Sequence, residues 1–429
     1  MANARKTAVT ALLSVDRDGC YSNIAVDNSI KSAKLEGVDA SFCSALIYGV
    51  LDRKNALDYI ISKCSSKPLN KLSLFVLEVL RISVFQLKYM DKIPPFAAIN
   101  EGVNIVKKSK EHYASGFVNA VLRGVMRQEI VLPEPVDALS ISITDSCDIS
   151  IVEKLIDSFG VETTHNILKN NNNPLPVYIR CNTTKCTSEQ LAEQLKKADI
   201  TADYVEGMPK TLILKGALEH TAAFKEGMFH VQDLACQMAC ESLEIKKGMA
   251  VLDVCAAPGG KSFTLASEIN NNGKIVSCDI HPHRVKLIEN GAKRLGFSCV
   301  EAKLNDATVY NSELGKFDRV LCDVPCSGIG VINRKPDIRY KNANEFEDLP
   351  QLQYDILKTS SVYLKKGGVI VYSTCTLFPK ENEEVFERFL EENKDFEPMP
   401  FDNGEYIRRI MPSEKNDGFF FARARRKED

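Results

Sequence analysis

From about residue 249 onward, short continuous apolar segments alternate with longer amphipathic segments, and this alternation restricts the fold more than any other feature. The apolar segments are typical of strands buried on both faces of a parallel sheet, and the amphipathic segments of the helices that cover it. We predict strands at Met249–Val254, Lys274–Cys278, Phe317–Cys322 and Gly368–Tyr372, with later strands around Arg408 and at Phe419–Ala424. We predict helices at Lys261–Ile269, His283–Leu295, Leu349–Leu364 and Lys380–Glu392.

Residues 1–135 show no strand pattern, and they predict an all-α domain. The segment Lys71–Tyr89 is apolar on almost every side, which indicates a central buried helix. Pro94 and Pro95 begin the next helix, since proline suits the first turn of a helix. The segment Gly116–Met126 completes the set.

A smaller mixed region over 145–235 follows a proline-containing boundary, and it predicts an α+β region. Its expected elements are a loop at Asn170–Asn173, a strand at Pro176–Asn182 and a helix at Ser188–Ala198 with Thr187 as its N-cap. The alternating segment forms a third, α/β domain over 236–429. Three domains agree with 429 residues, because domains commonly contain about 100–200 residues.

The charge is balanced over the whole chain but uneven along it. Lys and Arg total 55 and Asp and Glu total 57, so net charge alone cannot hold nucleic acid. Residues 1–135 carry 18 basic and 13 acidic side chains, whereas the remainder carries 37 and 44. The basic excess is either a surface for nucleic acid or an ordinary solvated helical surface, and both interpretations stay open at this point.

The fourteen cysteines show no C-x-x-C spacing, so we expect no metal site. No basic stretch followed by an apolar one marks a signal peptide, and no run of 18 apolar residues could span a membrane. We therefore expect a cytoplasmic protein with free thiols and no membrane contact.

The segment 251–266 (VLDVCAAPGGKSFTLA) runs from an apolar strand through a glycine-containing turn into a helix, which is typical of a nucleotide-like ligand site. A P-loop would need glycine where Cys255 stands, and a dinucleotide fold would need G-x-G-x-x-G, so neither pattern is met. The remaining interpretation is an S-adenosylmethionine site, in which Gly259 and Gly260 let the backbone approach the cofactor.

Acidic residues follow the next strands. Asp279 suits the hydroxyls of a ribose, with helix capping as the alternative. Asp306 suits an adenine amino group, or it is an ordinary loop acid. Asp323 follows the strand Phe317–Cys322 and lies near Cys326, where it could stabilise a ring nitrogen.

Cys326 and Cys375 each follow a predicted strand, and both strands should end at the same sheet edge. A lone cysteine is more often a small buried residue. Two cysteines beside a cofactor turn, however, fit methylation at carbon 5 of a pyrimidine. One thiolate adds to carbon 6 and activates carbon 5, and the second thiol assists removal of the carbon 5 proton.

The segments DVCAAPGGK, CDVPCSGIGV, KPDIRY and YSTCTLFPKENE closely resemble the RNA 5-methylcytosine methyltransferases, and GFVNAVLR resembles a NusB-like RNA-binding domain. The pairing resembles the bacterial 16S rRNA cytosine-5 methyltransferases of the RsmB/Sun/Fmu type over essentially the whole chain. The resemblance implies a Rossmann-like class I methyltransferase domain, S-adenosylmethionine as cofactor, Cys375 as nucleophile and Cys326 as the residue that helps release product. It implies cofactor contacts at Cys255, Ala256, Ala257, Pro258, Gly259, Gly260, Lys261, Asp279, Asp306 and Asp323, with Lys261 also reaching the catalytic pocket.

The same resemblance implies RNA as partner, here 16S rRNA before or during ribosome assembly, and we expect a monomer. For Gln232 and Asp233 we weigh ligand contact against helix capping by Asp233. Candidate RNA contacts, each of which could equally be a solvated side chain, are Arg5, Lys6, Lys107, Lys108, Lys110, Arg123, Arg180 and the loop Arg334–Arg339.

Two other functions remain. The chain could methylate a cytosine elsewhere in rRNA or in tRNA, or it could be an RNA-binding assembly factor with a vestigial methyltransferase fold. Loss of either Cys326 or Cys375 would favour the vestigial factor, and both are present.

Overall fold

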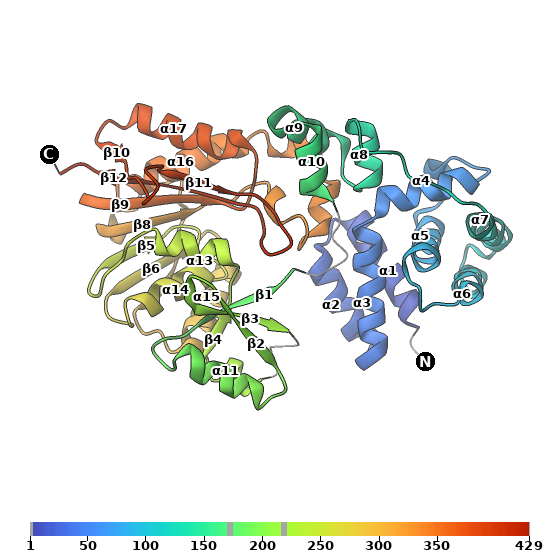
Figure 1. The fold of residues 1–429 in the computed structure, drawn as a ribbon, viewed down its shortest axis with the longest axis horizontal. Coiled ribbons are helices and arrows are strands. Elements are labelled where there is room, and N and C mark those ends of the chain that lie inside the picture. The colour runs from blue at the N-terminus through green and yellow to red at the C-terminus, as the bar shows by residue number, and fades with distance from the viewer. Residues whose placement is uncertain (1–2, 170–174, 216–220, 429) are drawn as a thin grey trace. The chain divides into compact units, whose positions relative to one another are not determined.

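The computed structural model describes residues 3–169, 175–215 and 221–428, drawn in Figure 1. The loop predicted at Asn170–Asn173 lies outside the described residues. The chain forms two compact units: residues 1–170 with 332–344, and residues 171–331 with 345–429.

The described part of the first unit is built of helices, as the sequence predicts. Helix α5 (Leu74–Tyr89) is the central one: Ser73 caps its N-terminus, and its side chains are buried continuously from Val76 to Gln86. It packs against α1 (Ala4–Asp18), α3 (Gly37–Leu51), α4 (Lys54–Cys64), α6 (Pro95–Lys107) and α7 (Ser115–Arg127). The other α-helices in the described part of this unit are α2 (Ser22–Ala33), α8 (Ala138–Thr144), α9 (Ile149–Phe159) and α10 (Val161–Leu168). The predicted buried helix is confirmed, and Pro95 stands in the first turn of α6 as expected.

The segment 332–344, which follows the CDVPCSGIGV motif in the sequence, belongs to this helical unit. It contains the short 3-10 helix η5 (Pro336–Tyr340), in which Arg339 is fully buried. Arg339 Nη1 donates to the carbonyl oxygens of Asp145 (2.8 Å) and Leu168 (3.1 Å), and Nη2 donates to Asn333 Oδ1 (2.7 Å). The prediction of RNA contact is therefore wrong for Arg339, because its guanidinium satisfies buried carbonyls. Arg334 and Lys335 are exposed.

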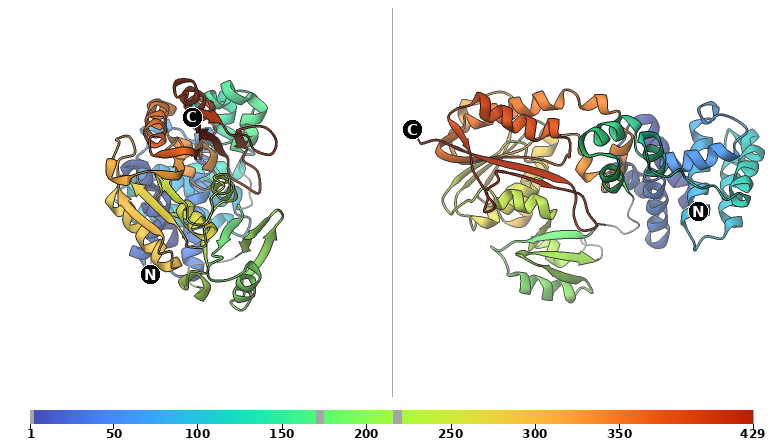
Figure 2. Two further views of the ribbon diagram at one scale, coloured as in Figure 1. Left: turned by 90° about the vertical axis from the view of Figure 1, so that its left-hand side faces the viewer. Right: turned by 45° about the horizontal axis from the view of Figure 1, so that its top comes forward.

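The second unit contains two sheets. The smaller is antiparallel with the order β2-β3-β1-β4, and α11 (Ser188–Lys196) packs on it (Figure 2). Its strands are β1 (Val177–Cys181), β2 (Thr201–Val205), β3 (Met208–Lys215) and β4 (Phe229–Val231). Thr187 caps α11 as predicted. The β2–β3 hairpin was not predicted, because the side chains of β2 are half-buried or exposed and leave no apolar run.

The larger sheet has the order β10-β12-β9-β8-β5-β6-β7, with β11 paired to β12. Strands β5 to β9 are parallel, whereas β10, β11 and β12 join the edge antiparallel. The strands are β5 (Ala250–Asp253), β6 (Lys274–Asp279), β7 (Val300–Leu304), β8 (Phe317–Asp323), β9 (Leu364–Thr374), β10 (Phe396–Pro398), β11 (Ile407–Ile410) and β12 (Phe419–Arg426). The predicted parallel sheet is confirmed.

Helices cover both faces of this sheet (Figure 1): α13, α14 and α15 lie on one side, and α16 and α17 on the other. The bounds are α12 (Ala222–Lys225), α13 (Leu234–Glu241), α14 (Gly260–Glu268), α15 (Pro282–Leu295), α16 (Leu349–Ser361) and α17 (Glu383–Glu392). The helix predicted over Leu349–Leu364 ends at Ser361, because Leu364 already pairs with Phe317 of β8. This two-sided covering explains why the strands of the sheet read as continuous apolar runs.

Candidate active site

The chemistry-bearing residues gather at the carboxyl ends of β5, β6, β8 and β9, where open α/β sheets bind their ligands. Asp279 ends β6 and Asp323 ends β8. Cys375 directly follows β9. Neighbouring parallel strands therefore bring together residues that are up to about a hundred positions apart in the sequence.

The turn between β5 and α14 leaves backbone donors available. Gly259 stands before α14 with φ +111°, and no side chain caps this helix. The first N–H groups of a helix have no partner within the helix, and its N-terminus attracts negative charge. The turn therefore fits the carboxylate of an amino-acid-like ligand such as S-adenosylmethionine.

Asp253, which the sequence analysis did not select, lies beneath this turn. Its Oδ2 accepts from Ser262 Oγ (2.7 Å), whereas Oδ1 is buried without a hydrogen bond. Burial raises the pKa of this carboxyl to about 7. An unpartnered buried carboxylate oxygen beside uncapped amides is a further fit to a zwitterionic ligand. The signal in the sequence was a single acidic residue within the otherwise apolar predicted strand Met249–Val254.

We expect the change Gly259→Ala to destabilise the methyltransferase domain by about 1–2 kcal/mol from the left-handed backbone alone. A Cβ at Gly259 would also lie 2.3 Å from the buried Phe263 ring. Gly260→Ala is the matched control, since the nearest atom to its Cβ would be Gln232 Nε2 at 3.9 Å. Thermal unfolding of both variants checks the expectation, which equal melting temperatures would contradict.

Asp279 and Asp306 lie at neighbouring strand ends. Asp279 is buried and its Oδ1 accepts from the His281 N–H (3.0 Å). Asp306 is exposed, and its Oδ1 accepts from Thr308 N (2.9 Å) and Oγ1 (2.6 Å). These local bonds use Oδ1 in each residue, so Oδ2 of Asp306 is available for a ligand, whereas Oδ2 of Asp279 lies 4.0 Å from Arg284 Nη1 in a long ion pair.

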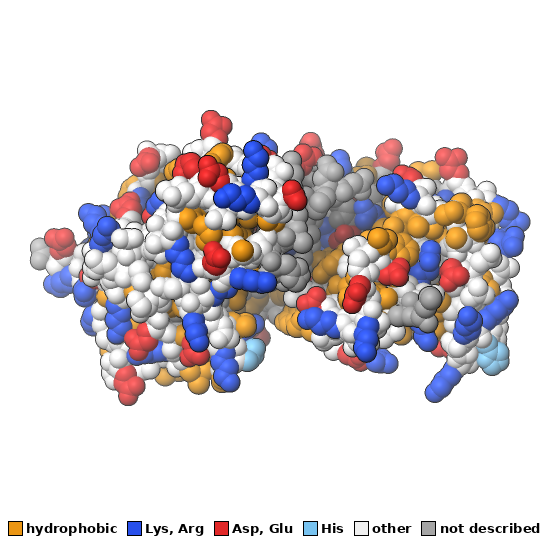
Figure 3. All heavy atoms as spheres, turned by 90° about the horizontal axis from the view of Figure 1, so that it is seen from below, with side chains coloured by type: hydrophobic (Ala, Val, Ile, Leu, Met, Phe, Trp, Pro, Cys, Tyr) orange, Lys and Arg blue, Asp and Glu red, His pale blue; other side chains and the backbone are white. Residues whose placement is uncertain are grey.

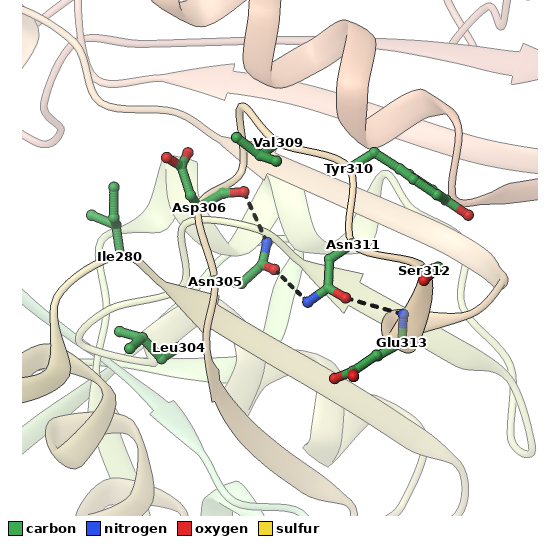
Figure 4. Close-up of a pocket in the computed structure, with 9 residues that line it drawn as sticks. All are labelled: Ile280, Leu304, Asn305, Asp306, Val309, Tyr310, Asn311, Ser312 and Glu313. Carbon is green, nitrogen blue, oxygen red and sulfur yellow. Dashed lines mark hydrogen bonds between the residues drawn. The ribbon is translucent and has the colours of Figure 1, made fainter.

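A shallow pocket lies beside Asp306 (Figure 4). Ile280 and Leu304 expose 54% and 58% of their surfaces and both line this pocket, so they give it an apolar wall. Asn305 bonds the Asp306 carbonyl (3.1 Å) and Asn311 (3.0 Å), so the pocket wall is braced by hydrogen bonds. An apolar surface beside a carboxylate suits a flat heterocycle with an amino group. Ile280 was missed by sequence reasoning, although it directly follows Asp279.

Lys261 and Asp323 form an ion pair at the centre of the site. Lys261 Nζ lies 2.6 Å from Asp323 Oδ2, and Ser373 Oγ donates to Asp323 Oδ1 (2.8 Å). Burial acts to lower the pKa of Lys261, but the Asp323 carboxylate together with Cys236 and Cys240 outweighs burial, so the pKa is raised well above its ordinary value. Lys261 is therefore a fixed positive charge that reaches from the cofactor turn to the end of β8.

The sulfurs of Cys326 and Cys375 are 3.3 Å apart. The Gly330 N–H donates to the Cys375 carbonyl (2.9 Å), which joins the two cysteine loops. The hydrogen bond with Cys375, followed by burial, raises the pKa of Cys326 well above its ordinary value. Cys326 is therefore a neutral thiol at pH 7. None of the fourteen cysteines forms a disulfide, and no group of His, Cys, Asp or Glu side chains in the described residues could hold a metal ion.

Gln232 and Asp233 contribute to the scaffold of the site. Asp233 caps α13 through the Ala235 N–H (3.0 Å), which is the alternative weighed above. Gln232 is buried and accepts from Thr264 Oγ1 of α14 (2.5 Å). Both residues thus help to place the helices that follow the small sheet and the cofactor turn.

Two of the arginines predicted to contact RNA, Arg5 and Arg180, form hydrogen bonds with side chains inside the protein. Arg180 exposes 1% of its surface and bonds Gln237 (3.0 Å), Glu241 (2.9 Å) and Glu268. Arg5 Nε donates to Gln86 Oε1 (2.7 Å) inside the helical unit. The prediction is therefore wrong for Arg180, and for Arg5 it competes with an intramolecular partner.

The other candidate RNA contacts are exposed: Lys6, Lys107, Lys108, Lys110 and Arg123. On the face shown in Figure 3, basic side chains are interspersed with acidic ones. Their contact with RNA stays a prediction.

We expect Arg180→Ala to lower the free energy of unfolding by about 1–3 kcal/mol, because it removes a buried guanidinium and leaves the buried Gln237 oxygen with one donor fewer, whereas Glu268 keeps Lys210 as its cation. Chemical denaturation measures this, with the exposed Lys107→Ala as control. Unchanged stability with weakened RNA binding would restore Arg180 as an RNA contact.

Comparisons with known proteins cover all three parts of the chain. The model described as 16S rRNA methyltransferase RsmB/F matches residues 240–425, the NusB family model matches 2–127, and the ferredoxin-like domain of RsmF/B-like methyltransferases matches 151–221. The probable ribosomal RNA small subunit methyltransferase B of Bacillus subtilis is 35% identical over 99% of both chains. The ribosomal RNA small subunit methyltransferase B of Escherichia coli is 31% identical over 91% of both.

Among solved structures, the crystal structure of PH0851 superposes with a TM-score of 0.83 at 23% identity, over 99% of this chain and 98% of that chain. Fold, site and comparisons together define an S-adenosylmethionine-dependent methyltransferase with a Rossmann-like catalytic domain and a NusB-like helical domain. The chain belongs to the RsmB/F family of 16S rRNA methyltransferases. The resemblance and the predicted fold class are thereby confirmed, whereas the boundaries 1–135, 145–235 and 236–429 stay predictions.

Proposed function

We propose that this protein methylates carbon 5 of a cytosine in small-subunit rRNA through a covalent bond between Cys375 and carbon 6. The single observation that carries the proposal is the 3.3 Å approach of the Cys326 and Cys375 sulfurs at the ends of adjacent strands. Carbon 5 of cytosine is a weak nucleophile, and a thiolate that adds to carbon 6 divides the reaction into two easier steps.

The two thiols have different roles in this proposal. Cys375 adds to carbon 6, and carbon 5 then takes the methyl group. Once the Cys375 sulfur is bonded to carbon, it no longer accepts the Cys326 proton, so the largest cause of the raised pKa of Cys326 is removed. Cys326 can then lose its own proton to solvent and accept the proton of carbon 5. The electrons of that C–H bond restore the double bond and expel the Cys375 thiolate.

Lys261 and Asp323 would hold the cytosine ring. The ion pair presents a cation and a carboxylate close together, which matches the acceptor and donor groups on the edge of a cytosine. The charge that develops on the ring during thiolate addition would be stabilised by these fixed groups.

S-adenosylmethionine supplies the methyl group. We propose that the turn Cys255–Lys261 and Asp253 hold its amino-acid part, that Asp279 holds its ribose, and that Asp306 with Ile280 holds its adenine. The uncapped helix α14, the buried Asp253 oxygen and the apolar pocket beside Asp306 support this assignment.

The test is methyl transfer from labelled S-adenosylmethionine to unmodified 16S rRNA, followed by nucleoside analysis. We expect label in 5-methylcytosine, and bisulfite mapping then locates the nucleotide. Label only in another rRNA or in tRNA would favour a different target, and no label in cytosine would reject the enzymatic proposal. No helix in the described residues is long and apolar enough to span a membrane. Action as a cytoplasmic monomer is part of the proposal.

A further inference from the structure

Glu381 is a buried carboxylate that binds the loop after β8. It lies in the 3-10 helix η7 (Pro379–Glu381), and 2% of its surface is exposed. Its Oε2 accepts from the backbone N–H of Ser327 (2.9 Å) and from Gln353 Nε2 (2.8 Å). Gln353 also donates to the Pro325 carbonyl (2.9 Å). Pro325 and Ser327 flank Cys326, so these contacts hold that cysteine from both sides.

The same carboxylate also binds the loop after β9. Thr376 Oγ1, directly after Cys375, donates to Glu381 Oε1 (3.4 Å) and lies 2.6 Å from Ser327 Oγ. Tyr372 of β9 donates its hydroxyl to the Glu381 carbonyl (2.5 Å). Glu381 therefore accepts hydrogen bonds from both the loop that carries Cys326 and the loop that carries Cys375.

The donors to the Glu381 carboxylate are neutral side-chain and backbone groups. Burial accordingly raises the pKa of Glu381, and its charge in turn contributes to the raised pKa of Cys326. A buried carboxylate without a cation costs free energy that an apolar side chain would not. The cost is consistent with a role in placing the residues around it.

We propose that Glu381 is a positioning residue that holds Cys326 and Cys375 at contact distance by joining their loops. The inference rests on the proposed function for its catalytic meaning, but the geometry can be tested without RNA or cofactor. The residue acts through Ser327 and Thr376, because these carry its hydrogen bonds to the cysteine loops.

Phenylarsine oxide tests the geometry in the full chain. Two neighbouring thiols form two As–S bonds with it and release water, so its affinity reports how well two sulfurs are held together. We expect Glu381→Gln to weaken binding at Cys326 and Cys375 about tenfold or more, since small displacements at active sites have effects of this size. Peptide mass spectrometry measures occupancy at each pair, and the Cys181–Cys186 pair, 3.7 Å apart, is an internal reference that should not change.

Glu384→Gln is the matched control, because Glu384 is exposed on α17 three residues further on. We expect it to bind the arsenical like the original protein. If Glu381→Gln does not fold, Thr376→Val removes a donor to the same carboxylate and should act in the same direction. Unchanged arsenical affinity in a folded Glu381→Gln protein would overturn the inference, as would an unmodified protein that does not hold the arsenical at this pair.

Methylation kinetics separate positioning from a general structural role. We expect Glu381→Gln to lower kcat about tenfold or more and to leave the KM for S-adenosylmethionine unchanged, because its partners lie outside the cofactor turn. Equal losses in kcat and cofactor binding would indicate a structural role and contradict the inference. An unmodified protein that binds the arsenical but methylates no cytosine would instead reject the proposed function.

Discussion

Replacing Cys375 by serine should abolish methylation, with a loss of at least about 10⁴-fold in kcat. A serine hydroxyl is not ionised near neutral pH, so it cannot add to carbon 6 as a thiolate does. Cys375 directly follows β9, and its sulfur meets that of Cys326 at 3.3 Å, so the change removes the attacking atom and leaves the strand in place. Label transfer to rRNA measures the loss.

The matched control is Cys299→Ser, which alters a free, partly exposed thiol of the same catalytic unit away from the two cysteine loops. We expect it to keep its activity. A protein–RNA adduct formed by the Cys375→Ser protein would show that the roles of the two cysteines are reversed.

The second large effect is the opposite in kind: Cys326→Ala should accumulate a covalent protein–RNA adduct and release almost no product. Cys375 is intact in this variant, so addition to carbon 6 and methyl transfer continue. Removal of the carbon 5 proton loses its acceptor, and the bond to Cys375 persists. Denaturing gels should show a slower band that contains both protein and RNA.

The double change Cys326→Ala with Cys375→Ala is the control, and it should give no such band. Rapid product release by the Cys326→Ala protein would mean that another group accepts the proton. In that case Cys326 would be a thiol with a raised pKa that lies beside the nucleophile and takes no part in proton removal.

The parallel strands could be predicted because burial on both faces leaves a signal within a few consecutive residues. Strand β6, for example, is buried from Ile275 to Asp279. Strand β2 (Thr201–Val205) gave no such signal, because its side chains are exposed or half-buried. It is held in the sheet by backbone pairing with β3. Local sequence pattern thus predicted the elements that are buried on both sides, and it missed those that depend on a neighbour.

The candidate site shows the same limit. The strand ends placed Cys326, Cys375 and Asp323 together in the prediction, because parallel strands share one carboxyl edge. The burial of Arg180 could not be predicted, because its partner Glu268 is 88 residues away in the sequence. No local pattern shows that a guanidinium will be buried against a distant carboxylate. The role of Glu381 could not be predicted from local sequence either, because Ser327 and Gln353, which donate hydrogen bonds to its carboxylate, lie on distant segments of the chain.

The segment 332–344 has a consequence for the order in which this protein can form. The carbonyls of Asp145 and Leu168 receive their donor from Arg339, which lies 194 and 171 residues further along the chain. These two carbonyls lie at the ends of α8 and α10, so they receive this donor only after residue 339 has been synthesised, whereas the buried core of α1 to α7 is built from residues 4–125. The hydrogen bonding of α8 and α10 is therefore completed only after part of the catalytic domain has been synthesised, although the helices themselves precede that domain in the sequence.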